Sequence, residues 1–267
     1  MIKDVQYSGI NISFCDQGQG NPVLLLHGYL ESLNIWDDFA TELTRKFRVI
    51  TIDLPGQGKS GVPGNIASME IMAEAIKAVF DHLNIDKAAI IGHSMGGYAM
   101  LAFYEAYPER VKSLGFFHSV SVADTEEKRA NRDREIGLIR QGKQNLIFNT
   151  NVPKSFANDN LEKFKDAIEC AKRIAGQAPG ENIIKVLEGM KVRKDRTYLV
   201  ENSNLLILFV VGMKDNYIPP DKLLNLASKA RNKQVIVLEN SGHMGFIEEK
   251  ELALDETENF LEKVFKN

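Results

Sequence analysis

The chain has 267 residues and a formal net charge of −3, and its acidic and basic residues are intermixed. Its length allows a complete hydrophobic core, whereas its charge pattern offers neither a basic stripe for nucleic acid nor a polybasic patch for a membrane. The N-terminal residues lack the apolar stretch of a signal peptide, and the longest apolar run, 205–211, is too short to span a bilayer. We therefore expect a cytoplasmic protein whose partner is a small molecule.

Short apolar runs rich in leucine or β-branched residues predict buried strands. Stretches with helical spacing lie between most of these runs, and the clearest, 72–83, follows Ser68, a suitable N-cap residue. Strands that alternate with helices predict a mainly parallel sheet with helices on both faces. The predicted strands are 23–26, 49–53, 88–91, 111–117, 205–211 and 235–238.

The alternation stops between residues 119 and 203, where helix candidates at 124–140, 161–171 and 183–187 occur without a convincing strand. Because strand-like runs resume afterwards, we interpret 119–203 as a helical insertion into a core domain formed by 1–118 and 204–267. Apolar side chains of this insertion, Phe148 among them, are candidates either for a substrate pocket or for plain packing against the core.

The segment Gly92-His93-Ser94-Met95-Gly96 fits the G-x-S-x-G pattern and lies between a predicted strand and a predicted helix. A serine at such a turn adopts a strained backbone conformation, and glycines two residues away on each side prevent clashes. The helix N-terminus that follows favours developing negative charge. The pattern therefore predicts an exposed nucleophile at Ser94.

A serine hydroxyl needs a base, and the base needs an orienting acid. Asp215 follows the predicted strand 205–211, and His243 follows the predicted strand 235–238. Since the carboxyl ends of parallel strands meet at one edge of a sheet, we expect both residues to converge on Ser94. Asp221 and Asp195 are weaker candidates for the acid, because one suits a helix start and the other lies in the insertion.

At this point the chain resembles the α/β-hydrolase superfamily, specifically its lidded, esterase-like members, over nearly its whole length. The resemblance implies a mostly parallel eight-stranded sheet, with the insertion after the sixth strand acting as a cap. It also implies that Ser94 is the nucleophile, Asp215 the acid and His243 the base, with the backbone N–H groups of Tyr29 and Met95 forming the oxyanion hole. The matching segments are LLLHGYLES, VITIDLPGQGKSG, IIGHSMGGYAM, LFVVGMKDNYIPP and VLENSGHMGFIEEKELALDETENFL.

The remaining histidines are weaker candidates for a catalytic role. His27 and His93 flank the proposed site, where we expect them to shape its loops, and His118 ends a predicted strand and could face the pocket. Met244, beside the proposed base, is a further pocket candidate. No group of His, Asp and Glu has the spacing of a metal site, so we expect neither a metal nor another cofactor.

Two other features indicate structure rather than chemistry. The stretch 56–61 matches G-x-G-x-x-G, but Val62-Pro63-Gly64 follows at once and would break the helix that a dinucleotide site requires. Cys15 and Cys170 cannot form a disulfide framework, and we expect both to pack as small apolar side chains.

With serine as nucleophile, hydrolysis of a carboxylic ester through an acyl-serine intermediate is the leading prediction. Thioesters and lactones would use the same groups. Three alternatives stay open: a small-molecule receptor that retains the triad, a cofactor-free haloperoxidase and a carbon–carbon bond hydrolase. The last typically has Asn before the nucleophile and Trp after the catalytic His, where this chain has His93 and Met244.

Overall fold

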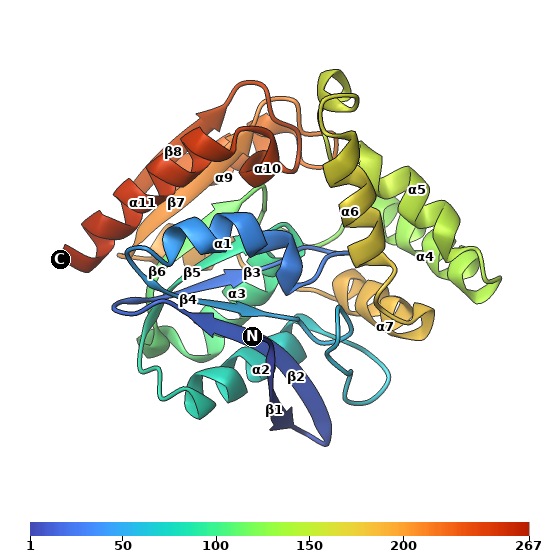
Figure 1. Cartoon of the computed structure of the whole chain (residues 1–267), viewed down its shortest axis with the longest axis horizontal. Helices are drawn as coiled ribbons and strands as arrows, with labels where there is room; N and C mark the ends of the chain where they lie inside the picture. Colours follow the sequence, from blue (N-terminus) through green and yellow to red (C-terminus); the bar gives the residue numbers. More distant parts are fainter. Residues whose placement is uncertain (267) are drawn as a thin grey trace.

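The computed structural model describes residues 1–266, and it contains one eight-stranded sheet with the order β1-β2-β4-β3-β5-β6-β7-β8 (Figure 1). From β4 and β3 onward to β8, neighbouring strands are parallel, while β2 runs antiparallel to both β1 and β4. The predicted mostly parallel, eight-stranded sheet is therefore confirmed. The strands are β1 (Lys3–Tyr7), β2 (Ile10–Gln17), β3 (Pro22–Leu26), β4 (Arg48–Ile52), β5 (Ala88–His93), β6 (Val111–Phe117), β7 (Leu206–Gly212) and β8 (Asn232–Leu238).

The six strands expected from apolar runs form, five of them within two residues of the predicted bounds. β8 begins three residues before the predicted strand, because its first three residues are polar and therefore lay outside the apolar run. No apolar run marked β1 or β2. In β1 the partly buried Val5 and Tyr7 alternate with exposed residues, which is the period-two pattern of an amphipathic edge strand.

Helices cover both faces of the sheet (Figure 1). Helices α1 (Asp37–Leu43) and α11 (Lys250–Lys266) contact each other on one face, and α2 (Met69–His82) contacts α3 (Met95–Ala106) on the other. The predicted N-cap residue of α2 is confirmed, since the Ser68 side chain accepts a hydrogen bond from the Ile71 N–H. The G-x-G-x-x-G stretch opens no helix, because the next one begins only at Met69.

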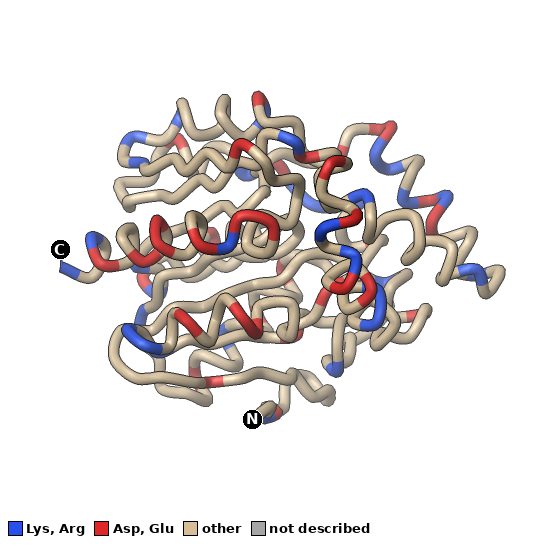
Figure 2. The backbone as a smooth tube through the Cα atoms, turned by 45° about the horizontal axis from the view of Figure 1, so that its top comes forward, with Lys and Arg blue, Asp and Glu red and all other residues tan. Residues whose placement is uncertain are grey.

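Five helices lie between β6 and β7, which confirms the predicted helical insertion after the sixth strand. We call the residues between these two strands the helical insert. Acidic and basic residues occur together along its helices (Figure 2). The helices are α4 (Glu126–Arg140), α5 (Gln144–Lys154), α6 (Lys165–Ala175), α7 (Gly180–Lys191) and α8 (Thr197–Asn202).

An aromatic cluster fills the core beneath the carboxyl end of the sheet. The ring centroids of Trp36 and Phe246 are 4.3 Å apart, and both rings pack against Phe117. Phe246 also contacts His93 edge-on, with 5.1 Å between the centroids. The loops at this end of the sheet therefore rest on a rigid apolar floor.

The two cysteines differ in environment. Cys15 in β2 is buried, as expected, but Cys170 is exposed, so the prediction of apolar packing was wrong for it. Helix α6 turns Ile168, Ala171 and Ile174 inward, which leaves the position of Cys170 on the solvent side. None of the described helices has both the length and the apolar character that a membrane span requires.

Candidate active site

Ser94 lies at the sharp turn from β5 into α3, with φ 48° and ψ −114°. A positive φ in a non-glycine residue is strained and persists only where the surroundings fix it. Here the Ser94 N–H donates to the Phe117 carbonyl at 3.0 Å, and the Ser119 hydroxyl donates to the Ser94 carbonyl at 2.6 Å. Both partners come from β6 or the residues directly after it, so the neighbouring strand holds the strained turn.

The glycines of the motif are required because the chain packs against itself at this turn. A Cβ atom at Gly92 would lie 2.5 Å from the backbone of Gly96 and Gly97. A Cβ atom at Gly96 would lie 2.4 Å from the Leu26 carbonyl oxygen of β3. The steric role predicted from the sequence is therefore visible in the structure.

Asp215 and His243 meet beyond the ends of β7 and β8, where the Asp215 Oδ2 atom lies 2.7 Å from His243 Nδ1. The other carboxylate oxygen accepts the N–H groups of Tyr217 at 2.7 Å and Ile218 at 2.9 Å. Burial raises the pKa of Asp215, but the neighbouring His243 and the hydrogen bonds outweigh burial and bring the pKa below its usual value. Asp215 is therefore ionised and holds the imidazole in one orientation.

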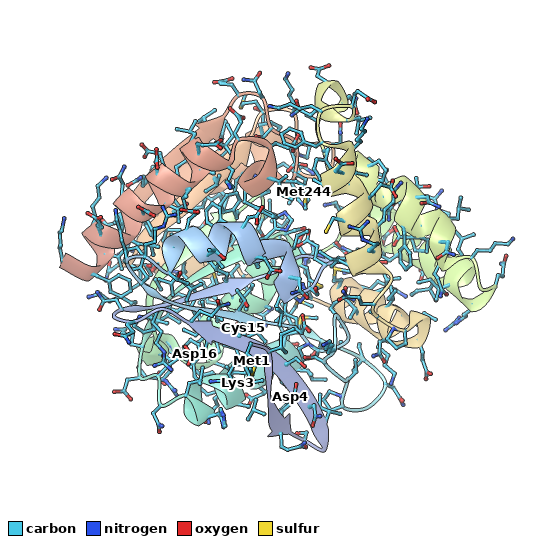
Figure 3. All side chains as sticks on the ribbon, viewed as in Figure 1. Met1, Lys3, Asp4, Cys15, Asp16 and Met244 are labelled. Atoms are coloured by element: carbon cyan, nitrogen blue, oxygen red, sulfur yellow. The ribbon has the colours of Figure 1, made fainter. Side chains whose placement is uncertain are left out.

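Ser94 and His243 line one cavity of about 760 Å³ between the carboxyl end of the sheet and the helical insert. Met244 also lines it, and Figure 3 labels this residue where the segment after β8 faces α6. Within the described chain neither the Ser94 hydroxyl nor His243 Nε2 makes a hydrogen bond. Both groups are therefore free to meet a ligand in the cavity, and such contacts commonly tighten only when a substrate is present.

Tyr29 lines the same cavity, and Met95 follows Ser94 as the first residue of α3. The N–H of a first helical residue has no acceptor within its own helix. The Tyr29 hydroxyl donates to the Glu135 carboxylate of α4 at 2.9 Å, which links the loop after β3 to the helical insert. Asn151 of α5 donates to the other oxygen of Glu135 at 3.0 Å.

His93 is fully buried and does not line the cavity. Its Nδ1 lies 3.0 Å from Glu31 Oε2, and its Nε2 lies 2.9 Å from the carbonyl oxygen of His243. Burial lowers the pKa of His93, but the charge and hydrogen bond of Glu31 outweigh burial and raise it above the usual value. Glu31 also accepts the Gly28 N–H at 2.6 Å. His93 therefore shapes the loops around the site rather than the cavity itself.

The other predicted pocket residues also lie behind the cavity wall. His27 is fully buried, and its Nε2 accepts the Leu54 N–H at 3.0 Å. His118 is buried beside Asp215, with 3.8 Å between Nδ1 and Oδ2, and burial brings its pKa well below the usual value. Phe148 packs inside the helical insert. None of these three residues lines the cavity, and of the five predicted pocket residues only Met244 does.

Sequence reasoning missed several residues of the site. Glu31 and Glu135 carry no local motif, because their partners lie 62 and 106 residues away in the chain. Arg132 of α4 also lines the cavity, although its charge-rich segment reads as a solvated helix face. Among residues 1–266, no cluster of three His, Cys, Asp or Glu side chains could hold a metal ion.

Comparison with known proteins finds relatives that cover most of the chain. Residues 21–128 match the family model for the α/β hydrolase fold. A hydrolase of 2-hydroxy-6-oxononadienedioate and 2-hydroxy-6-oxononatrienedioate from Escherichia coli K12 is 30% identical over 252 residues, which cover 88% of this chain and 85% of that protein. The structure of a thermophilic esterase from Thermogutta terrifontis, solved with malate bound, superposes with a TM-score of 0.94, at 29% identity and with 99% of both chains covered.

A further relative is longer than this chain. The dihydrolipoyllysine-residue acetyltransferase component of the acetoin cleaving system from Pseudomonas putida is 29% identical over 249 residues, which cover 91% of this chain. The chain spans 64% of the length of that protein. The similarity therefore concerns one part of the longer relative.

Proposed function

Because the chain belongs to the α/β-hydrolase superfamily, we propose that it is a serine hydrolase that cleaves a carboxylic ester of a small, largely apolar substrate. The proposal rests on the 2.7 Å hydrogen bond that Asp215 makes with His243, because His243 lines one cavity together with the strained Ser94. An oriented imidazole and a serine hydroxyl without a hydrogen-bond partner in the part of the chain that the structure describes, both in one cavity, are the groups that acyl transfer needs.

In the first half of the proposed reaction, Ser94 Oγ attacks the carbonyl carbon of the ester while His243 Nε2 accepts the hydroxyl proton. Asp215 keeps the other ring proton on Nδ1 and stabilises the imidazolium that forms. The N–H groups of Tyr29 and Met95 donate to the oxyanion of the tetrahedral intermediate. His243 then gives its proton to the departing alcohol, which leaves the acyl group on Ser94.

In the second half, a water molecule attacks the acyl-serine while His243 accepts one of its protons. The second tetrahedral intermediate uses the same oxyanion hole and collapses to release the carboxylic acid. His243 returns the proton to Ser94 Oγ, so the enzyme is unchanged at the end. No step calls for a metal or an organic cofactor.

The helical insert, with predicted bounds 119–203, acts in this proposal as a cap on the core formed by 1–118 and 204–267. Apolar side chains of the insert, among them Leu138, Val152 and Met190, line the cavity together with Ser94. A cap of this kind excludes water and selects the substrate by shape. Thioesters and lactones that fit the cavity would react through the same groups.

A second candidate function is carbon–carbon bond hydrolysis, which the 30% identity to the Escherichia coli hydrolase supports. Against this candidate, the chain has His93 and Met244 at the two positions where carbon–carbon bond hydrolases typically have Asn and Trp. A receptor with a retained triad and a haloperoxidase are the remaining alternatives.

The test is turnover of ester substrates of graded acyl length by wild type and by Ser94→Ala, together with labelling by a fluorophosphonate. We expect label on Ser94 alone and loss of turnover in Ser94→Ala, with Ser228→Ala as control because Ser228 is an exposed residue of α9 (Pro220–Lys229). Turnover that survives Ser94→Ala refutes the nucleophile. Tight ligand binding without turnover in wild type supports the receptor instead.

A further inference from the structure

One buried carboxylate in the helical insert is shared by two arginines. Asp124 Oδ2 lies 2.5 Å from Arg132 Nε, and Asp124 Oδ1 lies 2.5 Å from Arg193 Nη1. The side chains of Asp124 and Arg193 are 0% and 2% exposed, and that of Arg132 is 16% exposed. Since guanidinium groups stay charged, the three side chains together carry one net positive charge in a desolvated place.

The shared carboxylate leaves arginine donors without partners. Arg193 Nη2 is buried and has no hydrogen-bond acceptor, while the guanidinium lies 4.0 Å above the Tyr98 ring. Arg132 uses Nε and Nη2 on Asp124, and its Nη1 makes no hydrogen bond within the described residues. Of these two donors, only that of Arg132 belongs to a residue that lines the cavity, so Arg132 Nη1 is the donor of the cluster that a ligand can reach.

Arg132 also lines the proposed substrate cavity. Two further carboxylates line the same cavity: Glu31 accepts His93 and Gly28, and Glu135 accepts Tyr29 and Asn151. Both donors to Glu135 are neutral, so Glu135 keeps its negative charge beside Arg132. A third carboxylate, Glu127, is exposed at the cavity rim.

Further cations around the cavity have no acidic partner. Lys128, Lys154 and Lys222 line it and form no ion pair within the described part of the chain, and the exposed Arg134 contacts only the Asn131 side chain. The cavity lining thus holds five cationic side chains against three carboxylates, so its charge balance is positive, and the side chain of Arg132 is only 16% exposed.

From this charge imbalance we propose that the cavity accepts an ester whose acyl part ends in a carboxylate, which binds Arg132. Ser94 and Arg132 both line this one cavity. A half-ester of a short dicarboxylic acid carries an ester carbonyl for Ser94 and a carboxylate for Arg132 in one molecule. This inference rests on the proposed function: it keeps the ester and the nucleophile, and it replaces the apolar end of the acyl part by a carboxylate.

A purely structural role for the cluster makes a different prediction. Arg193 alone would balance Asp124, and it also bonds the Val122 carbonyl at 3.0 Å, so the fold needs only one of the two arginines. Replacing Arg132 by methionine keeps the chain length and leaves a neutral Asp124–Arg193 pair. Because Arg132→Met also leaves the buried Asp124 Oδ2 without its donor, we expect the variant to fold with a lowered melting temperature, which is measured before its kinetics.

The experiment compares monomethyl glutarate with methyl 5-methylhexanoate, in which an isopropyl group replaces the carboxylate, and follows methanol release. Wild type is expected to prefer monomethyl glutarate. Arg132→Met is expected to lose about 10- to 100-fold in kcat/KM on that ester, as for one charge-assisted hydrogen bond, and to keep its activity on the neutral ester. Arg129→Met, which removes an exposed arginine of α4 outside the cavity lining, is the matched control and is expected to match wild type on both esters.

Two results overturn the inference: no preference for the charged ester in wild type, or an equal loss on both esters in Arg132→Met. Calorimetric titration of Ser94→Ala with glutarate measures the subsite without the reaction. Glutarate binding that is lost in the Ser94→Ala, Arg132→Met double variant supports the subsite even where ester turnover fails, which would refute only the proposed function. Ester turnover without glutarate binding refutes the subsite alone.

Discussion

The imidazole Nε2 of His93 lies 2.9 Å from the backbone carbonyl oxygen of His243. The residue before the proposed nucleophile is thereby bonded to the residue proposed as base. Through Nδ1, His93 also contacts Glu31, which accepts the Gly28 N–H next to the proposed oxyanion donor Tyr29. One chain of hydrogen bonds therefore joins the three loops that carry Tyr29, Ser94 and His243, whose relative positions the proposed reaction requires.

Glu31→Gln is predicted to loosen this chain while keeping the shape of the cavity wall that Glu31 helps to line. The amide keeps the size of the side chain but loses the negative charge that attracts His93, so the three loops are less well aligned. We expect kcat to fall by about 10- to 100-fold, as for small misplacements of reacting groups, with KM little changed. Steady-state kinetics check this split, and a loss confined to KM would contradict the positioning role.

His93 also predicts how stability depends on pH. Its pKa is raised in the folded state, so its contribution is fully present below the unfolded pKa of about 6.5 and is lost as pH rises through the folded pKa. His93→Asn removes this contribution. The difference in unfolding free energy between wild type and His93→Asn should therefore be largest below about pH 6.5 and shrink at higher pH. A difference that is constant from pH 5 to pH 9 would refute the pairing with Glu31.

Asp215→Asn is predicted to leave the cavity intact but to disorient the base. The amide can donate a hydrogen bond to Nδ1, which favours the tautomer with its proton on Nε2, the atom that must accept the proton of Ser94. We expect kcat to fall by about 10⁴-fold. Asp221→Asn, an exposed residue in the first turn of α9, is the control and should retain wild-type kcat. Equal losses in both variants would argue against Asp215 as the acid.

The parts of the site that follow strands could be predicted from the sequence, and the parts that depend on contacts between distant segments could not. Ser94, Asp215 and His243 each follow the end of a recognisable strand by one to five residues, so sheet topology alone brings them to one edge. Glu31 and Arg132 are recognised only by what they touch, because a single carboxylate or a charge-rich helix is ordinary in sequence. The edge strand β1 was missed for a related reason, since only its pairing with β2 buries its weak apolar pattern.

A final prediction concerns two glycines in the helical insert that look alike in sequence but differ in surroundings. A Cβ atom at Gly189 of α7 would lie 1.8 Å from the Ala67 carbonyl oxygen and 2.4 Å from its carbon, so α7 touches the backbone before α2. A Cβ atom at Gly137 of α4 would meet nothing within 4 Å. The same substitution therefore tests close packing at one site and helix propensity at the other.

We expect Gly189→Ala to lower the free energy of unfolding by about 1–3 kcal/mol, because the helix must move away from a rigid backbone atom. Gly137→Ala is expected to raise it by about 0.5–1 kcal/mol, since alanine loses less conformational entropy than glycine in a helix. Urea unfolding followed by circular dichroism measures both changes. Opposite signs support α7 as a docked part of the molecule, whereas a stabilising Gly189→Ala would show that α7 does not rest on residue 67 in solution.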